Sequence, residues 1–230
     1  MRKFLLIFTT IFLAGCSSQN TVKEPAVKTP VVTEPQQTEL SSALESKQIE
    51  IPYEHPVVKI ITSKGNMIVE LYEDKAPNTV ANFISLADSG FYTNMHFHRV
   101  IKGFMAQGGC PHSRVDRPSR SRPGTGGPGY TFNNETHPRL RHSHRGIISM
   151  ANSGPHTNGS QFFILFKRSN FLDGSYNVFG RVIEGMDVLE KIEAIGAQRD
   201  GMPLEEAVTF SVQVIQKNDH PYEVKKNSRK

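Results

Sequence analysis

Residues 97–109, FHRVIKGFMAQGG, carry the most structural information in the sequence. Their pattern is typical of a strand, a turn at Lys102 and Gly103, and a second strand that ends on the paired glycines. In such a hairpin Arg99 and Gln107 project from the same face. The hairpin therefore predicts a surface on which a guanidinium and an amide lie beside two large apolar side chains, those of Phe104 and Met105.

A second informative stretch is MANSGPHTNGSQFF at residues 150–163. Gly154, Pro155 and the run 157–159 are loop formers, whereas residues 161–166 are rich in the aromatic and branched side chains that favour strands. Together the two stretches predict an apolar surface with one guanidinium and a few amides.

Upstream of these stretches the sequence predicts a hairpin and a helix. Strand-like runs at 57–63 and 66–72 are joined by the turn-forming pair 64–65. A helix then begins at Pro77, and Gly90 ends it. Its apolar residues recur at the spacing of one helical face: Val80, Phe83, Ile84 and Ala87.

Downstream the sequence predicts two more strands and one more helix. A strand is expected over 177–183, a helix over 186–194, and a strand over 208–214, where apolar and polar residues alternate. Many short strands with only two helices favour a closed antiparallel barrel.

Three segments resemble the cyclophilin family of peptidyl-prolyl isomerases: FHRVIKGFMAQGG, SMANSGPHTNGSQFF, and FLDGSYNVFGRV at residues 171–182. The resemblance covers roughly residues 57–216, and its motifs are long and specific. It implies a mainly β domain at residues 55–217, folded as a closed eight-stranded antiparallel barrel with a helix over each open end. It also implies isomerisation of X-Pro bonds with no cofactor.

Residue roles are implied by the same resemblance, position by position. The catalytic residues are expected to be Arg99, Phe104 and Gln107. The substrate-binding residues are expected to be Met105, Ala151, Asn152, Ser153, Gln161, Phe163, Phe171, Leu172 and Tyr176. Asn152 would contact the substrate through its main chain, and a purely structural role is the alternative for Gln161.

These residue types suit catalysis of prolyl rotation. Rotation meets a barrier of about 18–20 kcal/mol because amide resonance is lost in the twisted state. No covalent step is needed, so a catalyst must hold the proline ring and stabilise the twisted amide. The prolyl nitrogen then regains a lone pair, to which Arg99 would donate a hydrogen bond. Aromatic and aliphatic side chains would hold the ring.

Two positions depart from the family pattern. Phe171 stands where the family has a tryptophan, and the chain contains no tryptophan at all. The family's indole donates a hydrogen bond to cyclosporin, so we expect weak cyclosporin inhibition with turnover retained. Tyr176 stands where many relatives have a pocket histidine, and a tyrosine can form the same wall.

The N-terminus has the features of an export signal. Two basic residues precede an apolar run at 4–13 that is too short to span a bilayer, and the run leads into LAGC at 13–16. This ending resembles the lipobox of bacterial lipoproteins. The resemblance implies a signal peptide at residues 1–15, cleavage before Cys16, and acylation of Cys16 as a membrane anchor. The alternative is an ordinary signal with an incidental cysteine.

Two segments outside the domain are expected to lack stable structure. Residues 16–54 are polar and contain regularly spaced prolines, which predicts a flexible tether. Residues 218–230 are polar and basic, and we expect disorder there. The formal charge is +5, and it becomes 5 − 2 = +3 when Arg2 and Lys3 leave with the signal.

Three further features each admit two interpretations. Cys110 is interpreted as a half-buried residue at a strand end, with a reactive thiol as the alternative. Histidines such as His142 and His144 invite a metal site, but no acidic cluster accompanies them, and no metal is expected. The arginines of 111–145, including the basic loop Ser113–Pro123, are interpreted as solvated charges. Phosphate, nucleic acid and anionic lipid are the alternatives, and export argues against nucleic acid.

The whole sequence predicts a monomeric bacterial cyclophilin, lipid-anchored in the cell envelope and facing the extracytoplasmic space. Its partners would be proline-containing polypeptides, and it would assist the folding of exported proteins. One rival is a binding module that holds Pro-containing segments with little turnover. A second rival is a structural envelope lipoprotein whose tether and basic loop carry its function.

Overall fold

The computed structural model describes residues 53–117, 119–196 and 207–228. The predicted signal peptide, Cys16 and all but the last two residues of the predicted linker lie outside these residues. Within them the structure has nine strands and two α-helices. The strands are β1 (Val57–Thr62), β2 (Gly65–Leu71), β3 (Met95–His96), β4 (Arg99–Ile101), β5 (Met105–Gly108), β6 (Ile147–Met150), β7 (Phe162–Leu165), β8 (Val178–Glu184) and β9 (Thr209–Gln216). The α-helices are α2 (Pro77–Asp88) and α3 (Met186–Ile195), and the short 3-10 helices are η1 (Pro111–Ser113) and η2 (Asn170–Leu172).

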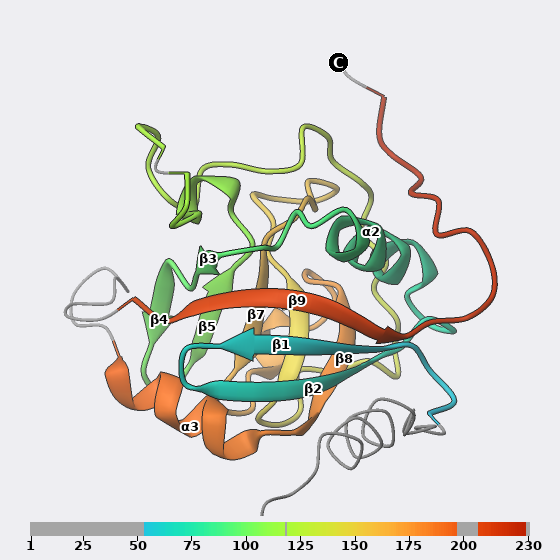
Figure 1. The fold of residues 1–230 in the computed structure, drawn as a ribbon. Helices are drawn as coiled ribbons and strands as arrows, with labels where there is room; N and C mark the ends of the chain where they lie inside the picture. Colours follow the sequence, from blue (N-terminus) through green and yellow to red (C-terminus); the bar gives the residue numbers. More distant parts are fainter. Residues whose placement is uncertain (1–52, 118, 197–206, 229–230) are drawn as a thin grey trace, which may run out of the picture. The chain divides into compact units, whose positions relative to one another are not determined.

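The strands form one curled antiparallel sheet in the order β3-β9-β1-β2-β8-β6-β7-β5-β4 (Figure 1). The prediction of a closed eight-stranded barrel is corrected: the described sheet has nine strands, and its order ends at β3 and β4 without a ladder between them. The reason lies in the residues between these strands. Phe97 is buried and its N–H donates to the carbonyl of Val208, so the chain follows β9 until it turns into β4.

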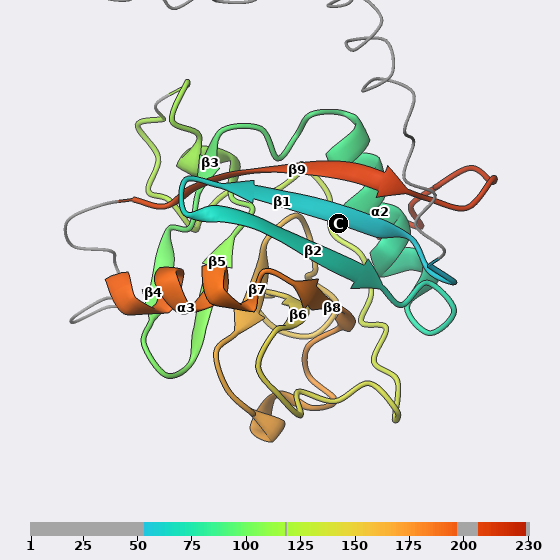
Figure 2. The same cartoon turned by 60° about the horizontal axis from the view of Figure 1, so that its bottom comes forward.

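The two helices lie on opposite sides of the curled sheet (Figures 1 and 2). The predicted apolar face of α2 is buried, and this helix ends two residues before Gly90, which has a φ of +71°. Helix α3 buries Val188, Leu189 and Ile192. No helix among the described residues is long and apolar enough to cross a membrane.

Aromatic side chains fill the main core between α2 and the sheet. Phe83 of α2 packs edge-on against Phe162 of β7, with ring centroids 5.3 Å apart, and Phe97 packs against Phe210 of β9 at 4.6 Å. All four side chains are fully or almost fully buried. Burial of this size is the dominant favourable contribution to folding, and it fixes the strands that carry the candidate site.

The C-terminal tail, defined here as residues 218–228, has no helix or strand, but several of its residues form hydrogen bonds with the rest of the domain. The Tyr222 hydroxyl donates to Oε2 of Glu73 at 3.2 Å. Further along, the N–H of Lys225 donates to Oδ1 of Asn78 in α2 at 2.7 Å. These long-range hydrogen bonds attach the tail to the domain, and composition alone does not reveal such partners.

Candidate active site

Four neighbouring strands place several predicted site residues in one row. Arg99 of β4 is opposite Gln107 of β5, and Gln107 is opposite Phe163 of β7. Phe163 is in turn opposite Ser149 of β6. Residues directly opposite one another on paired strands project from the same face of a sheet. The row therefore runs from the Arg99 guanidinium through the Gln107 amide to the Phe163 ring. The position of Arg99 and Gln107 on one face confirms the prediction from the hairpin pattern.

The predicted pocket residues gather in a second apolar cluster, separate from the main core. Its buried members include Met105, Phe163 and Leu172, and Phe104, Ala151 and Tyr176 pack against them. The ring of Tyr176 meets that of Phe163 edge-on, with centroids 5.8 Å apart. Tyr176 therefore packs within this apolar cluster beside Phe163.

Phe171 lies at the rim of this cluster rather than within it. It belongs to η2, its side chain is 75% exposed, and its ring centroid is 5.7 Å from that of Phe104. An exposed phenylalanine offers apolar contact to a ligand but no hydrogen-bond donor. Phe171 therefore supplies no hydrogen-bond donor in place of the indole N–H that a tryptophan would have here.

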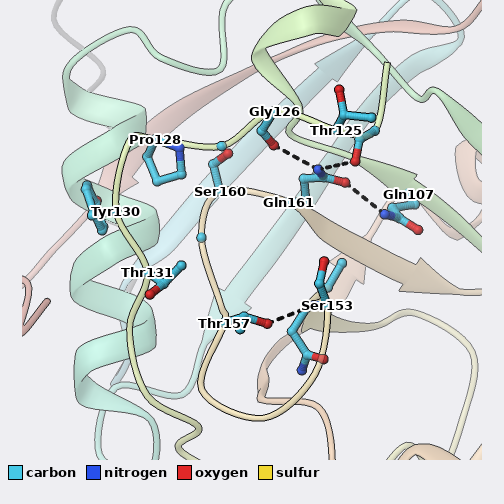
Figure 3. A pocket seen from close by; sticks show the side chains of 15 residues that line it. Gln107, Thr125, Gly126, Pro128, Tyr130, Thr131, Ser153, Thr157, Ser160 and Gln161 are labelled. Carbon is cyan, nitrogen blue, oxygen red and sulfur yellow. Dashed lines mark hydrogen bonds between the residues drawn. The ribbon is translucent and has the colours of Figure 1, made fainter. Parts of the chain in front are cut away.

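The side-chain amides of Gln161 and Gln107 are hydrogen-bonded to one another (Figure 3), and this chain of bonds continues to Arg99. Nε2 of Gln161 donates to the carbonyls of Gly124 and Gly126 at 2.8 and 2.9 Å. Its Oε1 consequently faces Gln107 and accepts from Nε2 of Gln107 at 2.9 Å. Oε1 of Gln107 then accepts from Nη1 of Arg99 at 3.4 Å. Each amide is held in a single orientation, and Gln161 has structural bonds as well as a place in the cavity wall.

Cys110 holds the other side of the glycine-rich segment 124–132. Its sulfur accepts the N–H groups of Gly124 and Gly126 at 3.1 and 3.3 Å. The residue is fully buried, which corrects the half-buried position predicted for it. Gly124 has a φ of +93°, and a Cβ there would lie 3.2 Å from Cδ2 of His98, so the close approach favours glycine. No local sequence pattern indicates this contact between Cys110 and the glycine-rich segment.

The polar side of the site borders a cavity of about 520 Å³ (Figure 3). Ala151, Asn152, Ser153 and Gln161 are among its lining residues. The side chain of Asn152 donates to the carbonyl of Ser175 at 2.9 Å and accepts from the N–H of Gly154 at 3.2 Å. The loop therefore engages both polar groups of this side chain, and the main-chain contact of Asn152 with substrate stays a prediction.

A buried polar group supports the aromatic wall from behind. His142 is fully buried, and its ring lies parallel to that of Phe163 with centroids 6.0 Å apart. Its Nδ1 donates to Oδ1 of Asp173 at 2.9 Å, and its Nε2 is 3.1 Å from Oγ of Ser149. Burial lowers the pKa of His142, against the raising effect of Asp173. The ring is therefore neutral at pH 7, and Nε2 accepts from the Ser149 hydroxyl.

Asp173 is ionised in this group. Burial opposes its charge, but hydrogen bonds from His142 and Arg141 outweigh burial and lower its pKa to about 2. The carboxylate accepts the main-chain N–H of His142 at 2.8 Å and Nε of Arg141 at 2.7 Å. Asp173 directly follows Leu172, so its bonds to His142 hold η2 beside the ring of Phe163. Sequence reasoning missed this group because its members are far apart in the chain.

Some other arginines of the long β5–β6 connection form ion pairs. Arg114 donates twice to Asp116 at 3.2 Å, and Arg145 lies 2.5 Å from Oε2 of Glu193. These two arginines are thus partly buried in ion pairs, rather than simply solvated as the sequence predicted for the connection as a whole. The part of the chain that the structure describes contains no group of three or more His, Cys, Asp or Glu residues placed to hold a metal.

Comparisons with known proteins agree with this geometry. The family described as cyclophilin type peptidyl-prolyl cis-trans isomerase/CLD matches residues 57–214. Peptidyl-prolyl cis-trans isomerase-like 1 of Aspergillus fumigatus is 41% identical over 158 residues, which are 69% of this chain and 94% of the relative. The isomerase-like 3 protein of Gibberella zeae is 47% identical over 150 residues, 64% of this chain and 89% of the relative.

Solved structures show the same likeness. A crystal structure of a Cryptosporidium parvum cyclophilin type isomerase has a TM-score of 0.63 and 36% identity, and covers 71% of this chain and 98% of its own. A second structure of that protein, in the presence of the dipeptide Ala-Pro, has a TM-score of 0.62 and 37% identity. This match covers 70% of the present chain and 99% of the Cryptosporidium chain. With the matched fold and the row of site residues, this chain belongs to the cyclophilin family of peptidyl-prolyl cis-trans isomerases.

Proposed function

We propose that this isomerase acts on X-Pro bonds of exported proteins and assists their folding while anchored to a membrane through acylated Cys16. The observation that carries the catalytic part is the row Arg99, Gln107 and Phe163 across three paired strands. The row places a cationic donor beside an apolar pocket, which is the combination that prolyl rotation requires.

The reaction needs only binding and charge stabilisation. The proline ring occupies the pocket walled by Phe104, Met105 and Phe163, which restrains the ring while the preceding peptide group turns. As the amide twists, its nitrogen becomes a hydrogen-bond acceptor, and the Arg99 guanidinium donates to it. Gln107 holds the guanidinium by accepting one of its N–H groups. This interaction is stronger in the twisted state than in the planar one, so it lowers the barrier.

The cellular part of the proposal rests on the N-terminal sequence. A basic start, a short apolar run and LAGC at 13–16 together favour export followed by acylation of Cys16. One acyl chain binds a membrane only weakly, whereas several chains anchor a protein firmly. The linker that the sequence predicts over residues 16–54 would let the domain meet polypeptides emerging at the membrane. The domain acts as a monomer in this proposal.

Two experiments test the two parts separately. For catalysis, the full chain should accelerate the proline-limited refolding phase of a test protein, and Arg99→Ala should not. For anchoring, labelled palmitate should enter the wild-type chain in a bacterial host but not Cys16→Ser, which should leave the membrane fraction. Label in both chains, or a wild-type chain that stays on the cytoplasmic side and resists external protease, would contradict the proposed anchoring.

A further inference from the structure

The C-terminal tail reaches a cavity next to the candidate active site. Asn227 and Ser228 line a cavity of about 960 Å³ together with residues from the glycine-rich segment 124–132 and from the loop 153–158. Figure 1 shows the tail (red) continuing past α2 after β9. Four residues of this cavity also line the active-site cavity: Gly127, Tyr130, Thr131 and Thr157. The two cavities therefore adjoin, and the tail borders the outer one.

Asn227 links the two segments that form the outer cavity. Its main-chain N–H donates to the carbonyl of Thr131 at 2.8 Å. Its side-chain Nδ2 donates to Oγ1 of Thr131 at 3.2 Å and to the carbonyl of His156 at 2.8 Å. The preceding residue, Lys226, places its ammonium 4.3 Å from the ring centroid of Tyr130. The tail is thus fixed to both walls by directional contacts.

The lining of the two cavities indicates what they bind. No Asp, Glu, Lys or Arg is among the lining residues of either cavity in the described chain. The linings offer main-chain groups, side-chain amides and hydroxyls instead. Such neutral donors and acceptors suit the backbone of a polypeptide rather than a charged small molecule.

We propose that the tail forms the outer end of the substrate groove, where Asn227 and Ser228 contact an extended substrate segment beyond the proline. The proposal rests on the proposed isomerase function and adds a determinant of substrate length to it. A short peptide fills only the proline pocket and the active-site cavity. A longer polypeptide also reaches the tail, and it gains binding there that does not depend on the state of the amide.

The test compares a proline tetrapeptide with decapeptides extended on one side or the other, using the full chain in detergent. For the favoured extension, the wild-type protein should show a kcat/KM about three- to tenfold above the tetrapeptide value, the range of one or two net hydrogen bonds. The gain should appear in KM and not in kcat, because the contact is the same in the planar and twisted states.

Asn227→Ala removes the two side-chain bonds, and it should reduce the ratio of decapeptide to tetrapeptide kcat/KM toward one. Asn218→Ala is the matched control, because Asn218 lies in the same tail but its side chain donates to Glu73 at 2.6 Å. This control should keep the wild-type ratio. A chain truncated after Val224 should behave as Asn227→Ala does.

Three outcomes would overturn the proposal. The wild type could show equal kcat/KM for all peptide lengths, or Asn227→Ala could keep the wild-type ratio of decapeptide to tetrapeptide kcat/KM. The third outcome is an equal reduction of this ratio in Asn227→Ala and in the control Asn218→Ala. Failure of the isomerase function itself would look different, since even the tetrapeptide would then turn over at the uncatalysed rate.

Discussion

Replacing Asp173 by asparagine tests the buried polar group behind the proline pocket. The substitution keeps the shape of the side chain but removes its charge. An asparagine oxygen can still accept from His142, but its NH₂ group then faces Nε of Arg141, which bonds Oδ2 of the carboxylate at 2.7 Å. Two donors facing each other cannot bond. The variant therefore loses a charge-assisted hydrogen bond and the ionic attraction that accompanies it.

The pKa of Asp173 sets the expected size of the effect. A shift from the ordinary 3.8 to about 2 corresponds to about 2 kcal/mol of folding free energy. The Asp173 side chain is 15% exposed and its partner Arg141 is 56% exposed. Solvent screening therefore reduces the expected loss to about 1–2 kcal/mol at pH 7. A lowered carboxyl pKa stabilises the fold above about pH 4, and this stabilisation is lost as the pH falls from 4 toward 2.

Urea unfolding at a series of pH values measures this effect. At pH 7 the free energy of unfolding of Asp173→Asn should be about 1–2 kcal/mol below that of the wild type. The two values should converge as the pH approaches 2, because the wild-type carboxyl then becomes protonated. Equal stability at pH 7, or a difference that does not change with pH, would refute the assigned role of the ionised carboxylate.

Three other substitutions give separate tests. Cys110→Ala should lower kcat/KM by about threefold or more, whereas Cys110→Ser should keep most of it, because a hydroxyl still accepts from the glycine-rich segment. Equal losses of kcat/KM in peptide assays would contradict a role for residue 110 as hydrogen-bond acceptor. Gly109→Ala places a Cβ 2.3 Å from the carbonyl of Ser160 at a φ of +84°, so chemical denaturation should show a loss of about 2–4 kcal/mol. Gly103→Ala, with a φ of +70° and nothing within 4 Å of its Cβ, is its control and should lose about 1 kcal/mol. Phe171→Trp supplies an indole donor and should lower the inhibition constant of cyclosporin about fivefold or more; an unchanged constant would show that the exposed rim does not limit inhibition.

The sequence predicted those parts of the fold and site that depend on local pattern. Alternation along β4 and β5 placed Arg99 and Gln107 on one face, and the helical spacing of Val80, Phe83 and Ile84 identified the buried side of α2. These predictions hold because side-chain direction in a strand or helix follows from backbone geometry alone.

The unpredicted parts depend on contacts between distant residues. Cys110 bonds Gly126, which lies 16 positions later in the chain, and Asp173 bonds His142, 31 positions earlier. The polar composition of the tail likewise does not reveal that Tyr222 bonds Glu73, 149 residues earlier in the chain. Composition measures how much apolar area a segment can bury, not whether the folded domain offers it matching hydrogen-bond partners.

The proposed catalysis depends on a hydrogen bond from Arg99 to the prolyl nitrogen in the twisted state. The most direct measurement is the isomerisation rate of a proline peptide with the wild-type chain and with Arg99→Ala, alongside the dissociation constant of the same peptide for both. A hydrogen bond from a charged donor contributes about 1.5–3 kcal/mol, so kcat/KM should fall at least about tenfold in the variant while peptide binding changes little. An Arg99→Ala protein that isomerises the peptide as fast as the wild type would contradict the account.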